Sequence, residues 1–136
     1  MTLKALNKNF KDYNFNEPDA RLLERFPSPF AYVADMKTII ELDCFEFTSL
    51  CPVTGQPDYG KILIEYTPSD YCVESKALKL YLMSFRNHGE FHEACTYKIA
   101  IDLYTLLKPK YIKVKGLFNS RGGISIHPVV IFGEKP

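Results

Sequence analysis

Apolar and polar side chains largely alternate through residues 38–47, TIIELDCFEF, a stretch rich in β-branched and aromatic residues. Such alternation is typical of a strand with one buried face. A turn-forming loop with two prolines and a glycine, residues 51–58, separates this stretch from a second one, KILIEY at 61–66. Because only a loop joins them, we expect the two strands to pair antiparallel.

Helical periodicity follows. Apolar side chains spaced i, i+3, i+4 and i+7 place one face of a helix at Leu78, Tyr81, Leu82 and Phe85. Gly89 suits the end of this helix, and a second helix is predicted from about residue 91 to 107. Beyond it, residues 111–118 and 124–132 have the pattern of two further strands joined by a turn.

The predicted order is therefore strand, strand, helix, helix, strand, strand (ββααββ). An α+β fold satisfies it, with a four-stranded antiparallel sheet and both helices on one face. Such a sheet has two open edges and an uncovered face, so we expect the chain to form a homo-oligomer. Residues 36–136 are expected to form one domain, and residues 1–35 an irregular N-terminal lead-in rich in polar residues and proline.

Composition excludes several classes of protein. The chain has 136 residues and a formal net charge of +1, without the basic excess typical of proteins that bind nucleic acid directly. No apolar run approaches the roughly 20 residues needed to span a bilayer. The N-terminal apolar stretch is too short for a signal peptide, so we expect a cytoplasmic location with reduced cysteines.

Cys51 is the first candidate for chemistry. It lies in a polar loop after a strand, and a thiolate is a strong nucleophile once its pKa is lowered. Asp58, seven residues further on, can serve as a proton carrier. Alternatively, Cys51 is a small buried apolar residue. The cysteines form no CxxC pair, so a structural zinc site has little support.

A second candidate cluster is residues 88–95, HGEFHEAC. His92 and Glu93 open the second helix, where their polar groups can face a ligand, and Phe91 can stack on a ring. A metal site is an alternative, with ligands His88, His92, Cys95 and Cys51. A third possibility is a solvated first turn whose acidic groups favour the helix dipole.

A third cluster is residues 74–81, ESKALKLY. We expect Ser75 to cap the helix, which leaves the carboxylate of Glu74 available. A phosphorylated cofactor can be held by the cations Lys76, Lys79, Arg86 and Arg121. The alternative is that they form a solvated helix face. The absence of a GxGxxG or GxxxxGK[ST] sequence after a strand disfavours a Rossmann or P-loop nucleotide site.

Taken together, these residues resemble the NADPH-dependent 7-cyano-7-deazaguanine (preQ0) reductases of queuosine biosynthesis, in their short single-module form. Residues 74–81 match the family signature at every position, and residues 47–58, FTSLCPVTGQPD, look like the family's nucleophile loop. Residues 84–93 and 121–125 are also similar, so the resemblance covers about residues 47–126.

The resemblance implies the tunnelling fold (T-fold), in which the sheets of several protomers close a barrel around a channel. Short members of the family are similar in forming decamers of two stacked pentamers, with sites at the subunit interfaces. This expectation agrees with the open sheet edges inferred above.

The resemblance also implies a reaction in the biosynthesis of a modified tRNA base. The thiolate of Cys51 would add to the nitrile carbon and form a covalent thioimide, and Asp58 would supply the proton to the nitrogen. Two NADPH would then reduce the adduct, in two steps and without a metal, to the primary amine 7-aminomethyl-7-deazaguanine (preQ1).

Further residues take roles through the same resemblance. Glu93 would bind the donor groups of the 7-deazapurine ring, His92 would assist proton movement, and Phe91 would stack. The base pocket would be completed by Val73, Glu74 and Ser75, and the cofactor phosphates would be held by Lys76, Lys79, Arg86 and Arg121.

One further hypothesis concerns Cys95, which lies just beyond His92 and Glu93 on the second helix and can therefore approach Cys51. Under oxidation the two would form a disulfide that protects the nucleophile. The alternative is a buried Cys95 that packs between helices.

Two rival functions remain. A GTP cyclohydrolase-like enzyme of the same fold would use zinc, held by Cys51, His88, His92 and Cys95. A non-catalytic module would bind a purine-like base without oxidising NADPH.

Overall fold

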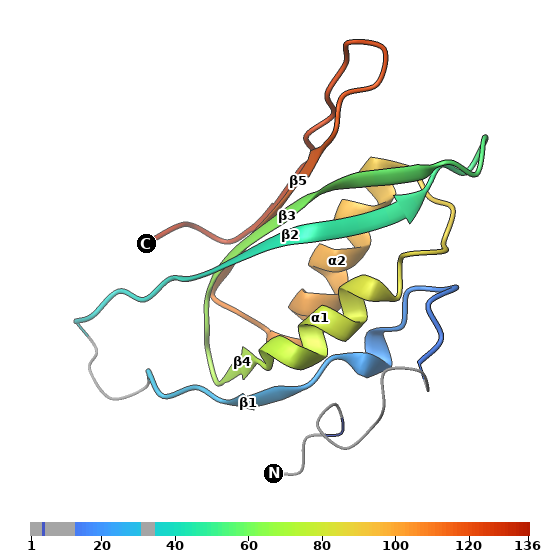
Figure 1. Ribbon diagram of the computed structural model, residues 1–136. Coiled ribbons are helices and arrows are strands. Elements are labelled where there is room, and N and C mark those ends of the chain that lie inside the picture. The colour runs from blue at the N-terminus through green and yellow to red at the C-terminus, as the bar shows by residue number, and fades with distance from the viewer. Residues whose placement is uncertain (1–3, 5–12, 31–34) are drawn as a thin grey trace.

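The computed structural model describes residue 4 and residues 13–30 and 35–136. Its elements are, in chain order, η3 (Ala20–Leu22), β1 (Arg25–Pro27), β2 (Ile40–Leu50), β3 (Pro57–Thr67), β4 (Tyr71–Val73), α1 (Ser75–Met83), α2 (His92–Leu107), β5 (Tyr111–Phe118) and β6 (Val129–Phe132) (Figure 1).

The main sheet has four antiparallel strands in the order β2-β3-β5-β6, and both helices lie on one of its sides (Figure 1). Buried side chains alternate with exposed or half-buried ones along β3 and, from Ile112 onward, with half-buried ones along β5, which is the pattern that predicts these strands. The α+β class and the antiparallel sheet are thus confirmed. In β2 the register shifts between Cys44 and Phe47, where a β-bulge places extra residues against β3.

The last strand is shorter than predicted. It begins at Val129, whereas the sequence pattern extends it back to Ile124. Pairing with β5 ends where the Gly116 N–H donates to the Pro128 carbonyl, 2.9 Å away, and the chain before Pro128 forms a loop that projects beyond the sheet (Figure 1). In this loop, residues 124–127 have no neighbouring strand to support a ladder, and only an isolated bridge joins Arg121 to Ile124.

A second, two-stranded sheet pairs β1 with β4 antiparallel, with Phe26 opposite Cys72. The sequence pattern does not predict it, since three residues are too few to reveal a period. The Glu74 N–H extends this pairing by donating to the Glu24 carbonyl at 2.9 Å. The second sheet thus attaches part of the N-terminal lead-in to the start of α1.

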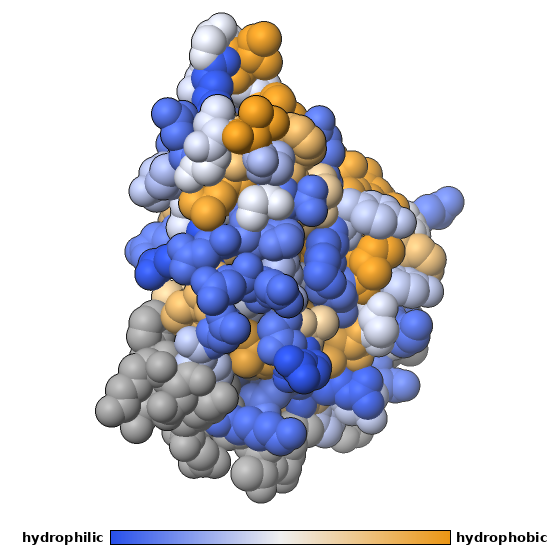
Figure 2. All heavy atoms as spheres, turned by 90° about the vertical axis from the view of Figure 1, so that its right-hand side faces the viewer, coloured by the Kyte–Doolittle hydropathy of each residue, from blue (hydrophilic) through white to orange (hydrophobic). Residues whose placement is uncertain are grey.

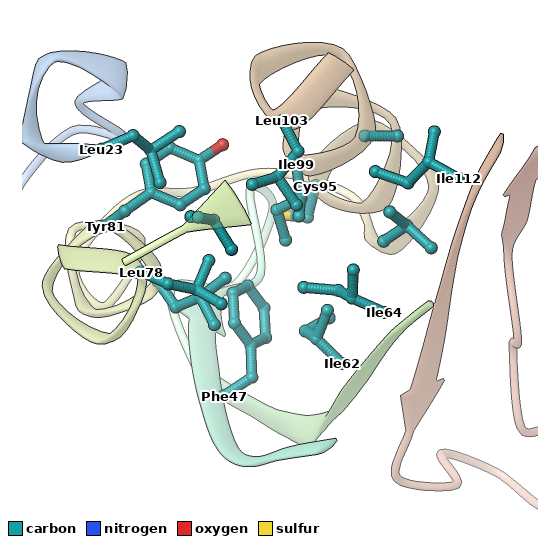
Figure 3. Packing of buried hydrophobic residues seen from close by; sticks show 14 of the residues in the cluster. Leu23, Phe47, Ile62, Ile64, Leu78, Tyr81, Cys95, Ile99, Leu103 and Ile112 are labelled. Carbon is teal, nitrogen blue, oxygen red and sulfur yellow. The ribbon is translucent and has the colours of Figure 1, made fainter. Parts of the chain in front are cut away.

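The core fills the space between the helices and the main sheet (Figure 3). Ile62 and Ile64 of β3 and Ile112 of β5 point at Ile99 and Leu103 of α2 (Figure 3). Each of these five side chains is at most 2% exposed. Burial of such a side chain stabilises a fold by about 1.5–3 kcal/mol, so this layer fixes α2 against the sheet.

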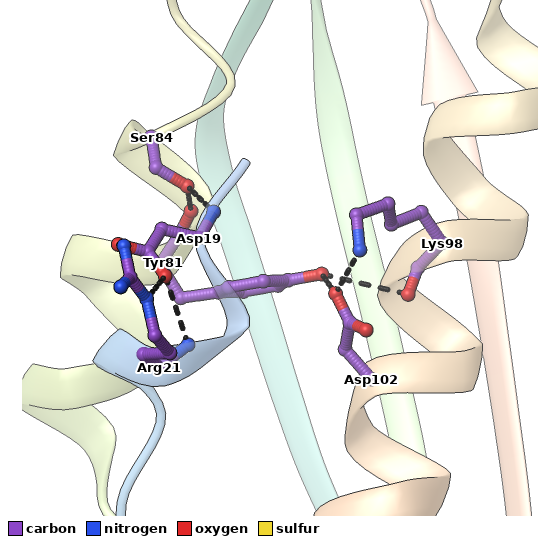
Figure 4. A network of polar contacts seen from close by, with 6 residues as sticks. All are labelled: Asp19, Arg21, Tyr81, Ser84, Lys98 and Asp102. Carbon is purple, nitrogen blue, oxygen red and sulfur yellow. Dashed lines mark hydrogen bonds and ion pairs between the residues drawn. The ribbon is translucent and has the colours of Figure 1, made fainter. Parts of the chain in front are cut away.

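A polar network joins α1 to α2 (Figure 4). The Tyr81 hydroxyl donates to the Asp102 carboxylate at 2.6 Å, and the Lys98 ammonium contacts the same carboxylate at 2.9 Å. Burial, reinforced by Asp102, raises the pKa of Tyr81 far above its ordinary value. On the other side of α1, the Asp19 N–H donates to the Ser84 hydroxyl at 3.1 Å, which ties the lead-in to this helix (Figure 4).

In the part of the chain that the structure describes, neither helix combines the length and the apolar character that crossing a membrane requires.

Candidate active site

Cys51 directly follows β2 and is held in a tight turn. Its N–H donates to the Gln56 carbonyl at 2.8 Å, and its own carbonyl accepts from the Gly55 N–H at 2.9 Å. Gly55 has a φ of 71°, which favours glycine at this position of the turn. The half-buried thiol is therefore fixed by backbone hydrogen bonds while solvent still reaches it.

The turn lowers the pKa of Cys51 from 9.0 to about 7. The largest cause is a hydrogen bond with the Thr54 side chain, followed by hydrogen bonds with the backbone of Thr54 and of Val53. Arg121 contributes a further, smaller hydrogen bond, and partial burial opposes the shift. Hydrogen bonds to a thiolate favour the charged form, so about half of this thiol is a nucleophile near neutral pH.

Asp58 lies one residue into β3, beside the turn, and is only 6% exposed. Its carboxylate forms an ion pair with the Arg121 guanidinium, whose Nη2 also lies 3.4 Å from the Pro57 carbonyl. Cys51 and Asp58, which the sequence places seven residues apart, are thus both contacted by Arg121. Ser49 of β2 is the strand partner of Asp58 and is fully buried.

The segment before α2 lies alongside the end of β2. The Leu50 N–H donates to the His88 carbonyl at 3.0 Å, and the Glu90 N–H donates to the Leu50 carbonyl at 3.1 Å. A Cβ atom on Gly89 would lie 3.3 Å from the Cα atom of Pro52, so a glycine permits this close approach. The predicted second cluster is in this way brought to the nucleophile loop.

His92 opens α2 and stacks on Phe118 of β5, with ring centroids 3.9 Å apart and ring planes 11° from parallel. Its Nδ1 is buried and has no hydrogen-bond partner among the described residues. The adjacent Phe91 is 58% exposed and Glu93 is also exposed, so both remain open to a ligand or to a second protein chain.

Cys95 follows in the first turns of α2 and is fully buried in the core. Burial raises its pKa to about 12, against a hydrogen bond with Ser49 that lowers it. The Ser49 hydroxyl has no nitrogen or oxygen partner among the described residues. The two cysteines near the site therefore differ in character, since Cys51 is activated and Cys95 is held as a thiol.

The β4–α1 junction corrects one prediction. Glu74, not Ser75, caps α1: its carboxylate accepts from the Lys76 N–H at 3.0 Å and from the Ala77 N–H at 2.7 Å. The Glu74 carboxylate is thus occupied rather than available. Val73 is buried, and its N–H donates to the Tyr66 hydroxyl at 3.1 Å.

A groove with a volume of about 690 Å³ runs between β2 and α1. Ser75, Lys79 and Arg86 line it together with the bulged part of β2, whereas Cys51, Asp58 and His92 do not. Lys76 is exposed at the start of α1 and does not line the groove. The cations predicted to bind the cofactor phosphates therefore lie in different places. Lys79 and Arg86 line the groove, Arg121 lies at the nucleophile, and Lys76 lies at neither.

The four metal ligands of the zinc alternative do not assemble. Across residue 4 and residues 13–30 and 35–136, no three His, Cys, Asp or Glu side chains come close enough together to hold a metal ion. His88 instead lies with its Nε2 3.6 Å from the Glu90 carboxylate.

Sequence reasoning gave no role to Thr54, Ser49 or Phe118, which contact Cys51, Cys95 and His92 respectively. Thr54 lies three residues after Cys51, where a turn can fold its hydroxyl back onto the sulfur, and this spacing is a usable signal. Nothing in the sequence indicates the stacking of Phe118 on His92, because the two belong to different elements.

Comparisons with known proteins agree on one family. A family model described as QueF-like protein matches residues 57–136. A protein of Helicobacter pylori strain P12, named NADPH-dependent 7-cyano-7-deazaguanine reductase, is 55% identical over 119 residues, which are 88% of this chain and 78% of that protein. A Streptococcus mutans protein of the same name is 49% identical over 132 residues, 97% of this chain and 79% of its own length.

A solved structure also shares the fold. The crystal structure of the archaeosine synthase QueF-Like in the apo form matches with a TM-score of 0.67 and 21% sequence identity, over 74% of this chain and 99% of that chain.

Proposed function

The chain belongs to the QueF-like family that includes the NADPH-dependent 7-cyano-7-deazaguanine reductases, and on this basis we propose that it reduces the nitrile of preQ0 to the primary amine preQ1 with NADPH. The observation that carries the proposal is the pairing of an activated thiol, Cys51, with a buried carboxylate, Asp58, through one arginine. A protein that only bound a base would have no use for this pair.

Cys51 acts as the nucleophile. Its sulfur attacks the nitrile carbon, a C–S bond forms, and the electron pair of one C–N π bond moves to nitrogen. Asp58 supplies the proton that this nitrogen takes up, so that the adduct is a neutral thioimide. The lowered pKa of Cys51 makes the attacking thiolate available near pH 7.

Collapse of the reduced adduct returns Cys51 to the thiolate. NADPH, when bound, supplies the hydride ions, two per nitrile, for this four-electron reduction. Cys51 holds the reacting carbon in place for the first reduction and then leaves as the thiolate.

The groove between β2 and α1 fits a phosphorylated cofactor. Lys79 and Arg86 bring two cations to a groove that is lined mainly by apolar side chains, and its volume of about 690 Å³ is in the range of ligand sites. Ser75 and Lys76 lie at the start of α1. Together with Arg121 they complete the set of residues proposed to bind the cofactor. These residues would bind and orient the cofactor phosphates.

The 7-deazapurine ring is recognised around the start of α2. Glu93 accepts hydrogen bonds from the donor-rich edge of the ring, Phe91 stacks on it, and His92 assists proton movement. Val73, Glu74 and Ser75 contribute through the β4–α1 junction. Because the Glu74 carboxylate caps α1, its contribution comes from this fixed position rather than from a free side chain.

The protein works as a homo-oligomer, a decamer of two pentamers built on the T-fold. No strand of the described residues pairs with either edge of the main sheet, and the edge strand β2 carries Phe45, which is 60% exposed. Apolar side chains also gather on the projecting loop at the top of the molecule, which contains Ile124 and Ile126 (Figures 1 and 2). A second protomer that covers these surfaces would bring the groove and the nucleophile loop of adjacent chains into one site.

The enzyme acts in the cytoplasm, with preQ0 as a free small molecule rather than as part of a nucleic acid. In a reducing compartment its four cysteines would be kept as thiols. Under oxidation Cys51 forms a disulfide with Cys95 that protects the nucleophile. Peroxide treatment followed by a reductant should restore activity in the native enzyme and fail to do so in a Cys95→Ala variant, whereas equal irreversible loss in both would contradict the pairing.

One experiment separates the proposed function from its rivals. Absorbance of NADPH is followed at constant enzyme after addition of preQ0, and the product is identified by mass spectrometry. Oxidation of two NADPH per preQ1 formed supports the reductase. Binding of preQ0 without NADPH oxidation would favour the non-catalytic module, and release of a product from GTP by zinc-loaded enzyme would favour the cyclohydrolase-like alternative.

A further inference from the structure

Arg121 reaches the nucleophile from a different part of the sheet. It lies in the loop after β5, where its N–H donates to the Ile124 carbonyl at 2.9 Å and its carbonyl accepts from the Ile124 N–H at 3.0 Å. Gly122 and Gly123, with φ of 58° and 80°, form the turn between these residues. This small hairpin orients the Arg121 guanidinium toward the start of β3.

The contacts of Arg121 are to the reacting groups themselves. Its guanidinium pairs with the Asp58 carboxylate, hydrogen bonds to the Cys51 sulfur and lies near the Pro57 carbonyl. The Asp58 side chain is 6% exposed, whereas that of Arg121 is 43% exposed. Taking a charged carboxylate out of water is costly unless it is paired, and Arg121 is the cation that pairs with it.

One guanidinium serves both groups of the first step, through an ion pair with the Asp58 carboxylate and a hydrogen bond to the Cys51 sulfur. The planar fork of arginine suits the task better than a lysine ammonium, since it can donate to two acceptors at once.

We propose that Arg121 is a positioning residue of the nucleophile loop, which fixes the Asp58 carboxylate at the start of β3 and donates to the Cys51 sulfur before substrate or cofactor binds. This inference rests on the proposed reductase function and assigns Arg121 a task besides any contact with a cofactor phosphate. The groove supports the distinction, since Lys79 and Arg86 line it and Arg121 does not.

The proton balance of the first step follows. When Cys51 is a thiol, its proton passes to the Asp58 carboxylate, the sulfur forms its bond to the nitrile carbon, and Asp58 passes the same proton to the nitrile nitrogen. When Cys51 is already a thiolate, the proton for the nitrogen enters from solvent by way of Asp58. In both cases Asp58 ends the step as a carboxylate, still paired with Arg121. Asp58 and Arg121 thus return to their starting state before the next substrate binds.

The test measures Cys51 directly, without substrate or NADPH. Wild type, Arg121→Met, Arg121→Lys and the matched control Arg86→Met are alkylated with iodoacetamide between pH 5.5 and 9.5, and the peptide that contains Cys51 is quantified by mass spectrometry. Among the described residues, His88 and Glu90 belong to the segment that hydrogen bonds to Leu50, the residue before Cys51. These are unchanged in every variant, so their effects cancel in the comparison.

The wild-type midpoint should lie near pH 7, set by the pKa of Cys51. In Arg121→Met it should rise by a fraction of a pH unit, less than in a Thr54 variant, because Arg121 makes the smallest of the hydrogen bonds that lower this pKa, and the alkylation rate at pH 7 should fall up to about twofold. Arg121→Lys should recover part of the loss, and Arg86→Met should match the wild type. Equal maximum rates at pH 9.5 and an unchanged melting temperature show that the turn is still folded.

An unchanged alkylation profile in a folded Arg121→Met protein, with a raised KM for NADPH, would overturn the proposal and leave Arg121 as a cofactor contact only. Failure of the proposed function looks different: the wild type would not reduce preQ0, while the alkylation midpoints would still separate as expected.

Discussion

Thr54 offers the sharpest test of how this chain activates its nucleophile. Its side chain makes the hydrogen bond that contributes most to the low pKa of Cys51. Thr54→Val removes the hydroxyl while it keeps the β-branched shape and the backbone N–H. The two backbone hydrogen bonds of the turn, from the Cys51 N–H to the Gln56 carbonyl and from the Gly55 N–H to the Cys51 carbonyl, stay in place, whereas the hydrogen bond from the Gln56 N–H to the Thr54 hydroxyl at 3.3 Å is lost.

The size of the effect follows from the two pKa values of the thiol. At pH 7 a thiol with a pKa of about 7 is roughly half ionised, whereas one with the ordinary value of 9.0 is ionised to about 1%. Loss of every donor would therefore lower reactivity about fiftyfold. Loss of the Thr54 hydroxyl alone should give an intermediate decrease, roughly fivefold to tenfold, because the backbone donors of Val53 and Thr54 remain.

The assay is again the pH dependence of alkylation, read together with kcat/KM for preQ0. A lowered pKa places the rise in activity between about pH 6 and 8, with a plateau above, because the thiolate is the reactive form. In Thr54→Val this rise should move to higher pH, and activity near pH 9 should recover toward that of the wild type. Thr54→Ser, which keeps the hydroxyl, is the matched control.

Two results would refute the reasoning. An alkylation midpoint in Thr54→Val equal to that of the wild type would mean that the hydroxyl does not stabilise the thiolate. A loss of activity that stays the same at pH 7 and pH 9 would mean that the substitution damages the loop rather than the ionisation of Cys51.

Two further predictions concern the supporting structure. The Tyr111 hydroxyl donates to the Glu65 carboxylate at 2.6 Å and is the main cause of the lowered pKa of Glu65. Tyr111→Phe should lower the free energy of unfolding at pH 7 by about 1–2 kcal/mol. A lowered carboxyl pKa stabilises the fold above the ordinary value of 4.5 and less as pH falls through the folded value, so urea titrations should show this difference narrowing below about pH 4. A Cβ on Gly116 would lie 2.6 Å from Cε2 of Phe118, so Gly116→Ala should destabilise the protein by roughly 1–3 kcal/mol and lower kcat by displacing the ring on which His92 stacks. Unaltered urea midpoints would contradict either prediction.

The main sheet could be predicted because its strands alternate. Residues 111–118 bury every second side chain against the helices, and this period is visible in the sequence itself. The short pairing of β1 with β4 could not be predicted, because it depends on contacts between distant segments rather than on a local period. The bounds of β6 failed for a related reason, since apolar residues in a projecting loop look like a strand until the partner strand is known to end.

The residues of the candidate site were likewise predictable from the sequence only in part. Cys51 and Asp58 were recognisable because one loop carries both, and the structure brings them to the same guanidinium. The role of Glu74 as a helix cap was missed because propensity favours serine at this position, whereas the longer glutamate reaches two backbone N–H groups here. Arg121 was assigned to the cofactor by its charge alone, and its partners become visible only once the strands are paired.

The central claim is that Cys51 bonds covalently to the nitrile, and peptide mass spectrometry tests it most directly. Wild-type protein is mixed with preQ0 in the absence of NADPH, denatured and digested, with Cys51→Ala treated in parallel. The account predicts a mass increase of one preQ0 on the peptide that contains Cys51, which disappears when NADPH is added before quenching. Unmodified Cys51 in a protein that still oxidises NADPH with preQ0 would contradict it, because reduction would then proceed without the covalent bond.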